Sequence, residues 1–367
     1  MKKRNVLRVC ICLELLGLLL VWGIFRQNAS EAKDLQMVDS AMAQSEEDYI
    51  KWVDFTVTTD ALAKSYEYDV NTYEQSVHIS WIELLAYVAA RTGGDFSSQK
   101  KVESLMGEAA EHLENGGSIE ELTEDLKYYA YYQEAYTAAL GGMVGEYEIE
   151  TEEGWENRYG LKAFLPIAKG FPYSDYDDFG VSRSYGYKRQ HLGHDMMGQT
   201  GTPIIAVESG YVEALGWNQY GGWRIGIRSF DKKRYYYYAH LRKGFPFALN
   251  LQEGSVVQAG DVIGYMGHTG YSATEDVNNI DETHLHFGIQ LIFDESQKEG
   301  NNEIWIDPYP LVRFLYRNRS ETVRNDATKE WARKYEMRDP ACAVYEAARS
   351  KEQEDGKETG KESSVAP

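Results

Sequence analysis

The second half of this 367-residue chain consists of short β-type runs separated by glycine-containing turns, and this pattern restricts the fold more than any other feature. From about Leu161 onward, aromatic and β-branched residues are frequent in stretches such as "TPIIAVESGYVEALGW", "RYYYYAHL" and "GSVVQAGDVIGYMG". Several short strands with turn residues between them predict a mostly antiparallel β domain.

The first half carries helix signals instead. Ser80 and Ser118 each begin a capping-box pattern, in which a Glu follows three residues after the Ser. Between them, apolar residues recur at intervals of three and four, at Val102, Leu105, Met106, Ala109 and Leu113. The helix that begins at Ser118 is predicted to run to about Leu140. Three or four helices therefore form a small domain over residues 45–145, and the fold class is α+β.

The N-terminus is basic and then apolar. Four basic residues within the first eight precede an apolar run from Val9 to Phe25, which only Glu14 interrupts. This is the pattern of a secretory signal peptide or of an uncleaved signal anchor. Because no small-x-small cleavage motif closes the run, we expect residues 1–29 to be a transmembrane anchor in the bacterial cytoplasmic membrane, with the rest of the chain outside. Secretion after signal cleavage is the alternative.

The composition beyond this segment narrows the setting further. Only Cys342 lies outside the apolar run, so the exported part can form no intrachain disulfide, which fits a bacterial envelope. The formal net charge of −20, from 58 acidic against 38 basic side chains, argues against nucleic acid as a partner. We expect a helical extension over residues 319–348 and, because residues 349–367 are charged and lack aromatics, a disordered tail.

The stretch "THLHFG" at residues 283–288 carries two imidazoles in a strand pattern. His284 and His286 alternate with apolar neighbours and therefore lie on one face of the strand, with Cβ atoms about 7 Å apart. Both could bind a metal ion, or one could bind while the other transfers protons. Two half-exposed histidines without a task are the third reading.

A second group of potential ligands lies earlier in the chain. His191 and Asp195 are four residues apart in "RQHLGHDMMG", and imidazole nitrogen and carboxylate oxygen are both good zinc ligands. A third ligand from His284 or His286 would complete a three-residue set. Three protein ligands leave one tetrahedral position for water, as in catalytic rather than structural zinc sites. The pattern therefore indicates a hydrolytic zinc centre.

Residues 161–312 resemble the M23 family of zinc metallopeptidases, the lysostaphin/LytM-type peptidoglycan endopeptidases. The resemblance rests on the order and spacing of "HLGHD" (191–195), "GTPIIAVESGYVEALGW" (201–217), "YYAHL" (237–241), "GSVVQAGDVIGYMGHTG" (254–270) and "THLHFGI" (283–289). It implies a mostly antiparallel β domain with a groove along one face, which we place at residues 155–318.

The resemblance also implies roles for five residues. The HxxxD motif of the family falls on His191 and Asp195, and the HxH motif falls on His284 and His286. One Zn²⁺ per chain would then be bound by His191, Asp195 and His286. His240 and His284 would be the unligated catalytic pair, which acts on the attacking water and on the oxyanion.

Two features depart from the family pattern. A connection of residues 271–283, "YSATEDVNNIDET", stands where the family has a short link, and we expect it to rim the groove and to restrict which peptides enter. The segment before His191 is shorter than in many relatives, which predicts a more open groove there. His194 and His268 are expected to have structural roles only.

We therefore predict a zinc-dependent endopeptidase that hydrolyses peptide bonds in bacterial peptidoglycan, in the stem peptide or in a cross-link. A non-catalytic, membrane-anchored LytM-type scaffold in an envelope or sporulation complex is the alternative. The helical domain would then contact envelope protein partners.

Overall fold

The computed structural model describes residues 49–184, 188–300 and 302–362. The chain divides into two compact units, Met1–Trp52 and Val53–Pro367, and the first is described only at residues 49–52. No helix in the described ranges is long and apolar enough to cross a membrane. The predicted anchor at residues 1–29 lies outside these ranges.

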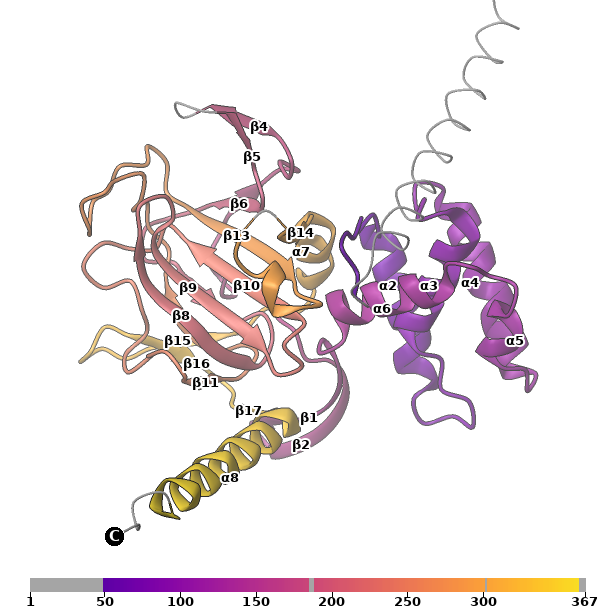
Figure 1. Cartoon of the computed structure of the whole chain (residues 1–367). Coiled ribbons are helices and arrows are strands. Elements are labelled where there is room, and N and C mark those ends of the chain that lie inside the picture. Colours follow the sequence, from indigo (N-terminus) through magenta and orange to yellow (C-terminus); the bar gives the residue numbers. More distant parts are fainter. Residues whose placement is uncertain (1–48, 185–187, 301, 363–367) are drawn as a thin grey trace, which may run out of the picture. The chain divides into compact units, whose positions relative to one another are not determined.

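The second unit begins with helices, shown in indigo to magenta in Figure 1: α2 (Thr59–Thr72), α3 (Trp81–Thr92), α4 (Gln99–Glu114), α5 (Ile119–Thr123) and α6 (Tyr129–Leu140). Ser80 caps α3 by accepting a hydrogen bond from the Glu83 backbone N–H, and the predicted capping box of Ser118 and Glu121 is present at α5. The five apolar residues that predicted α4 are all buried on that helix.

The single helix predicted to run from Ser118 to Leu140 is wrong. The chain leaves the helical path after Thr123 and re-enters it at Tyr129, with turn hydrogen bonds from Leu126 N to Thr123 O and from Tyr129 N to Leu126 O. No glycine or proline lies in this stretch to announce the break. Tyr136 on α6 is completely buried, so the direction of α6 is set by tertiary packing rather than by the preceding sequence.

An eight-stranded sheet, all of whose pairings are antiparallel, forms the centre of the β region (Figure 1). Its strand order is β11-β8-β9-β10-β13-β6-β3, with β14 paired to β13. The strands are β3 (Ser174–Asp175), β6 (His194–Met197), β8 (Gly210–Asn218), β9 (Gly222–Ser229), β10 (Arg234–Ala239), β11 (Val256–Val257), β13 (His284–Leu291) and β14 (Ile304–Ile306). The mostly antiparallel β fold predicted for this region is confirmed.

The two faces of this sheet have different roles. Side chains of one face are fully buried in the core, namely Ile225, Ile227, Tyr236, Tyr238, Leu285, Phe287 and Ile289. The residues that alternate with them, such as Arg224 on β9, Tyr237 on β10 and His286 on β13, face an open cavity. Because side chains alternate with a period of two, one face stabilises the fold and leaves the other free for a site.

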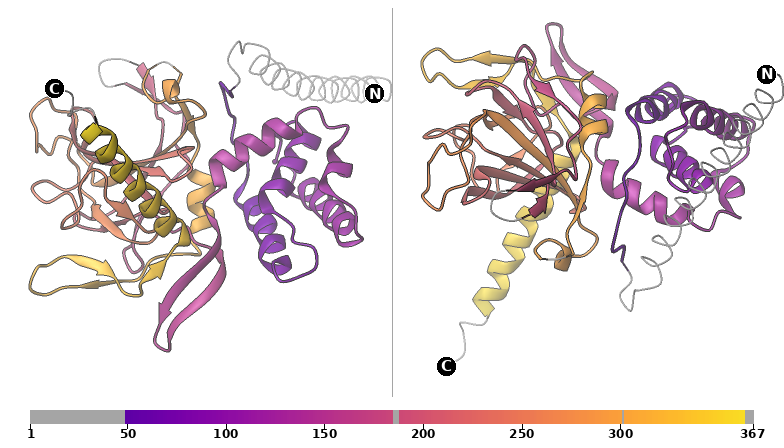
Figure 2. Two further views of the ribbon diagram at one scale, coloured as in Figure 1. Left: turned by 60° about the horizontal axis from the view of Figure 1, so that its bottom comes forward. Right: turned by 90° about the horizontal axis from the view of Figure 1, so that it is seen from above.

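Smaller elements surround the sheet: the hairpin β1 (Val144–Thr151) and β2 (Gly154–Leu161), the pair β4 (Ser182–Ser184) and β5 (Lys188–Gln190), the pair β7 (Pro203–Ile205) and β12 (Val262–Tyr265), and a 3-10 turn at Glu295–Gln297. Helix α7 (Tyr309–Leu315) lies between the sheet and the first helices, as both views of Figure 2 show. Thr59 Oγ1 donates to the Pro310 carbonyl at 3.0 Å, and the Trp81 and Phe314 rings stack at 6.1 Å.

Arg234 joins the helical part to the sheet. Its guanidinium donates to both oxygens of buried Glu208, at 2.8 and 3.0 Å, and to the carbonyls of Thr137 and Ala138 in the last turn of α6, at 3.1 and 2.7 Å. A cation at a helix C-terminus also meets the negative end of the helix dipole. This ion pair therefore fixes the end of α6 against β10.

The helical extension predicted for residues 319–348 is wrong over its first part. Residues 319–338 instead contain the hairpin β15 (Thr322–Arg324) and β16 (Trp331–Arg333) and the strand β17 (Met337–Arg338), which pairs with β1. Met337 is completely buried in a small core with Phe164, Ala168, Ile205 and Ala259. This packing against distant residues overrides the local helical pattern.

The tail predicted to be disordered over residues 349–367 is helical as far as Glu362, at the end of α8 (Pro340–Glu362). The helix begins with an Asp cap, because Asp339 Oδ1 accepts a hydrogen bond from the Ala341 N–H at 3.0 Å. Ala, Glu, Lys and Arg dominate its sequence, and these residues favour helix even where little surface is buried.

Candidate metal centre

Strand pairing brings three of the predicted site residues together. His286 on β13 pairs directly with Asp195 on β6, and His191 lies four residues before Asp195. His191 Nε2 lies 3.0 Å from Asp195 Oδ1 and 2.9 Å from His286 Nδ1, and His286 Nδ1 lies 2.9 Å from Asp195 Oδ1. One atom from each of the three side chains therefore points to a common centre.

The geometry and charge of this cluster fit a zinc ion. Tetrahedral ligands about 2.0–2.1 Å from Zn²⁺ lie about 3.3 Å from one another, close to the spacing found here. Burial lowers the pKa of His191, but Asp178 and Asp195 outweigh it and raise that pKa to about 9. Burial raises the pKa of Asp195, but the hydrogen bonds with His191 and His286 hold that pKa far below its ordinary value. The site therefore favours a positive charge.

Close chain packing lets the ligands converge. A Cβ on Gly193 would lie 2.6 Å from the His286 ring, so any side chain at this position would push the ring away. The glycine between His191 and Asp195 thus permits His286 to reach Asp195.

A second layer of side chains holds the first, and the sequence did not reveal it. Asp178 is buried, and His191 Nδ1 lies 3.0 Å from its carbonyl oxygen and 3.2 Å from its Oδ2. Donation from Nδ1–H to Asp178 leaves the Nε2 lone pair of His191 for a metal. Arg183 binds Asp178 Oδ2 at 2.6 Å and Asp195 Oδ2 at 2.7 Å, so it orients both carboxylates.

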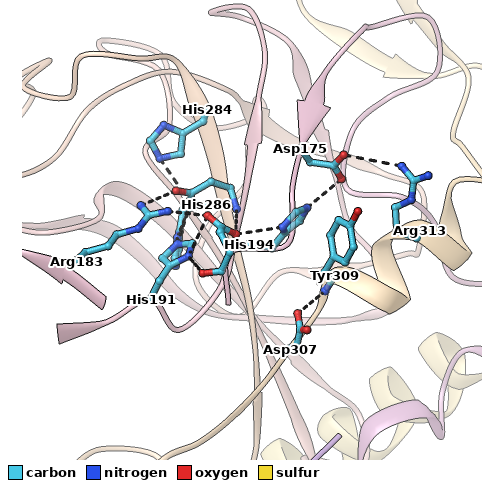
Figure 3. Close-up of polar contacts among 11 residues, drawn as sticks. Asp175, Arg183, His191, His194, His284, His286, Asp307, Tyr309 and Arg313 are labelled. Atoms are coloured by element: carbon cyan, nitrogen blue, oxygen red, sulfur yellow. Dashed lines mark hydrogen bonds and ion pairs between the residues drawn. The ribbon is translucent and has the colours of Figure 1, made fainter. Parts of the chain in front are cut away.

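His194 extends this layer away from the metal centre. It was expected to have a structural role, and it is completely buried with Nε2 3.1 Å from Asp175 Oδ2 and Nδ1 3.4 Å from Asp178 Oδ1. Burial lowers the pKa of His194, but the two carboxylates together raise it above its usual value. Figure 3 shows His194 between Asp175 and the ligand cluster, with Tyr309 of α7 beside its ring.

The two histidines predicted as catalytic lie next to the ligands. The His240 ring is 4.8 Å from that of His284 and 5.8 Å from that of His286. His240 Nδ1 donates to the Thr269 carbonyl at 2.9 Å, and His284 Nδ1 lies 2.9 Å from the Glu282 carbonyl. His284 Nε2 is 3.8 Å from Asp195 Oδ1. In each ring Nδ1 is therefore anchored and Nε2 is the atom left for proton transfer.

The environment of His240 differs from that of a surface histidine. Burial, followed by the nearby His284 and His286, lowers its pKa well below the usual value, so the ring is neutral near pH 7. Its backbone is left-handed, with φ 63°, which is uncommon for a non-glycine residue and recurs at functional sites.

The metal centre opens into a groove of about 710 Å³, a size typical of ligand sites. Three aromatic side chains lie on its floor, each against a glycine: Tyr235 against Gly226 of β9, Tyr237 against Gly221 in the turn between β8 and β9, and Trp305 against Gly288 of β13. A Cβ at Gly226 would lie 1.9 Å from the Tyr235 hydroxyl, and one at Gly288 would lie 2.7 Å from the Trp305 ring. The absence of a Cβ at these glycines lets the aromatic side chains pack closely against the backbone.

The insertion at residues 271–283 reaches the groove through one residue. Tyr271 lines the cavity, with its ring stacked 6.1 Å from that of His240. Asp276 is held away from the groove because its Oδ1 accepts hydrogen bonds from Trp223 Nε1 and from the Gly244 N–H, both at 2.8 Å. The loop thus contributes an aromatic wall to the groove, and its acidic residues are not among those that line it.

Comparison with known families and curated proteins places the metal centre within a known domain type. The model of Peptidase family M23 matches residues 189–302. The L-Ala–D-Glu endopeptidase of Bacillus subtilis is 36% identical over 149 residues, which are 41% of this chain and 42% of that protein. Lysostaphin of Staphylococcus simulans is 34% identical over 160 residues, 43% of this chain and 26% of that protein. The chain thus spans less than half the length of these curated relatives.

A solved structure is similar over a longer part of the chain. A proposed glycyl-glycine endopeptidase, LytM, from Ruminococcus gnavus superposes with a TM-score of 0.51 and 23% identity. The match covers 78% of this chain and 96% of that one. At this identity the likeness concerns the fold.

Proposed function

The chain contains a peptidase M23 domain, homologous to L-Ala–D-Glu endopeptidase, lysostaphin and LytM-type peptidoglycan endopeptidases, and from this premise we propose that it is a zinc-dependent endopeptidase of bacterial peptidoglycan. The observation that carries the proposal is the convergence of His191 Nε2, Asp195 Oδ1 and His286 Nδ1 beside two further imidazoles at the end of a groove. The groove gives an extended peptide access to the cluster.

His191, Asp195 and His286 would hold the metal, with Asp178 and Arg183 fixing the orientation of the first two. A zinc ion bound there supplies a Lewis acid and lowers the pKa of bound water. This donor set has no thiolate and offers three ligands, which suits a catalytic rather than a structural zinc.

His240 and His284 would move the protons. Each ring presents Nε2, because Nδ1 is bound to a backbone carbonyl. We propose that one Nε2 accepts the proton of the attacking water and passes that same proton to the leaving amine as the C–N bond breaks. The other ring, protonated from solvent, would donate a hydrogen bond to the scissile carbonyl oxygen as that oxygen becomes negative, and would keep its proton when the carbonyl re-forms. The carbonyl anchors keep both rings in place without a change of rotamer during the reaction.

The substrate we propose is a peptide of the cell wall, and the stem peptide rather than a glycine bridge is our first choice. Mass spectrometry of peptidoglycan digested by the full chain with zinc tests this directly, because the masses of the fragments identify the bond that is cut. We expect fragments separated between L-Ala and D-Glu. Release of free glycine peptides would contradict the choice of bond, and no release of fragments would contradict the peptidase itself.

We further propose that residues 1–29 anchor the chain in the cytoplasmic membrane with the peptidase domain facing the wall, as the basic and apolar N-terminal sequence predicts. Fractionation of cells that produce the full chain tests this. The chain should remain in the membrane fraction at its full mass, whereas a shortened form in the medium would favour secretion after cleavage.

A further inference from the structure

Three cationic side chains line the groove, and they are not alike. Arg183 is bound to the carboxylates of Asp178 and Asp195, and Lys298 Nζ lies 3.0 Å from Glu213 Oε2. Arg224 also lines the groove, but among the described residues no carboxylate lies within 4.0 Å of it. Arg224 is half-buried, and although Glu299 and Glu303 also line the groove, neither forms an ion pair with it.

The register of the sheet places Arg224 in line with the metal centre. Asp195 pairs with His286, and His286 pairs with Ala239 on β10. Tyr238 pairs with Ile225 on β9, so the next position of this antiparallel register puts Ala239 level with Arg224. These residues form a row across four strands on the groove face.

The same row sets the distance between the guanidinium and the reaction centre. Neighbouring strands are about 4.7–4.9 Å apart, so the Cα atoms of His286 and Arg224 are separated by two strand spacings, about 10 Å. Ala239, which lies between them, has the smallest side chain of the row and leaves the floor open there. An extended peptide advances about 3.3–3.6 Å per residue, so three residues or fewer cover this spacing.

The immediate surroundings of Arg224 leave its charge available. Gly226 is two residues after Arg224 on β9, and the Tyr235 ring packs against this glycine. Burial raises the pKa of the Tyr235 hydroxyl, and the positive charge of Arg224 acts against this rise, so the two groups are within electrostatic reach. A phenol can accept a hydrogen bond from the guanidinium but cannot neutralise it. The planar fork of N–H groups therefore remains suited to a carboxylate.

We propose that Arg224 binds a free carboxylate of the substrate, carried by a residue within three positions of the scissile bond. The inference rests on the proposed function and names its substrate class as an acidic peptide. In the stem peptide, D-Glu is linked through its side-chain carboxyl and leaves its α-carboxylate free beside the L-Ala–D-Glu bond. A glycine bridge offers no such group, so Arg224 selects the stem peptide over the bridge.

The test uses one pair of peptides and three forms of the full chain, each supplied with zinc. The peptides share the sequence L-Ala–γ-D-Glu–L-Lys and differ only in the α-carboxyl of D-Glu, which is free in one and an amide in the other. The variants are Arg224→Gln and, as a matched control, Arg324→Gln, which removes an exposed Arg of β15 that lies outside the groove lining.

We expect the wild type to cleave the free-carboxylate peptide with a kcat/KM about 10- to 100-fold above that of the amide, the worth of a charge-assisted hydrogen bond. Arg224→Gln should remove this preference by slowing cleavage of the acidic peptide alone, with zinc content unchanged, and Arg324→Gln should keep it. Equal cleavage of both peptides by the wild type, or equal slowing of both by Arg224→Gln, would overturn the inference.

A binding measurement separates this inference from the proposed function. In the His284→Ala background, in which slow turnover leaves the peptides intact, the acidic peptide should bind more tightly than the amide, and Arg224→Gln should abolish the difference. If the wild type cuts nothing but this difference in binding is present, the peptidase proposal fails and the role of Arg224 stands. Equal binding of the two peptides removes the role of Arg224 whatever the activity.

Discussion

Two parts of the groove, the candidate metal centre and the surroundings of Arg224, are built in opposite ways. At the metal centre, the outer atoms of two ligands already have protein partners, since Asp178 binds His191 Nδ1 and Arg183 binds Asp195 Oδ2. About 10 Å away across the sheet, Arg224 has no carboxylate within 4.0 Å among the described residues. In the function proposed here, the groups that are fixed before the substrate arrives would serve the chemistry, and the charge of Arg224 would serve the selection of substrate.

Loss of a proposed metal ligand should have the largest effect of all, and this effect should be on zinc binding. His286→Ala removes one of three protein ligands, so zinc bound by the full chain should fall from about one equivalent to nearly none. Metal analysis after dialysis measures this. His112→Ala, on α4 in the helical part, is the control and should bind zinc as the wild type does. Full zinc occupancy in His286→Ala would show that the ligand set is wrong.

Loss of a second-layer contact should have an intermediate effect. Asp178→Asn weakens the group that orients His191 and Arg183, and we expect zinc affinity to fall about 10- to 100-fold. Competition with a chromophoric chelator measures this affinity. Asp276→Asn is the matched change at a carboxylate outside the groove lining, which binds Trp223 and Gly244, and it should leave zinc affinity unaltered. Equal losses in the two variants would mean that Asp178 has no special role.

A change in the groove floor should have the smallest effect, a rise in KM for peptide, and should leave zinc binding unchanged. In Gly226→Ala the new Cβ would meet the Tyr235 hydroxyl at 1.9 Å, so the ring must move. Because the Tyr235 ring lines the groove, its displacement should cost about 1 kcal/mol of peptide binding, and we expect KM for peptide to rise roughly fivefold with zinc content constant. Gly145→Ala on β1, where the nearest atom is 3.4 Å away, is the control. An unchanged KM would show that the floor does not contact substrate.

The sequence identified the residues that meet at the candidate metal centre, but not the residues that hold them in place. His191, Asp195, His284 and His286 lie in short motifs, and once the region is a sheet the pairing of β6 with β13 brings them together. Asp178 was missed because it lies 13 residues before His191, in a stretch whose several acids look like an ordinary solvated loop. Only the folded chain shows which of these carboxylates is buried.

Arg224 was missed for a different reason. Its place opposite the metal centre depends on the register of two further strands, and nothing in "WRIGIRSF" separates it from Arg228, which is buried and paired with Glu213 and Glu295. The C-terminal strands were likewise hidden, because β17 is stabilised by β1, almost 190 residues earlier. Local sequence patterns identified most helices and the strands that carry the histidine motifs. The position of Arg224 and the C-terminal strands depend on pairing between distant parts of the chain, which such patterns do not show.

The measurement that tests the central claim most directly is digestion of purified peptidoglycan by the zinc-loaded full chain and by its His240→Ala and His284→Ala variants. We predict that the wild type releases peptide fragments and that both variants retain about one zinc per chain but work about a hundredfold or more slowly, as the loss of a positioned acid or base requires. A wild type that binds zinc and releases no fragments, or variants that digest the wall at the wild-type rate, would contradict the account.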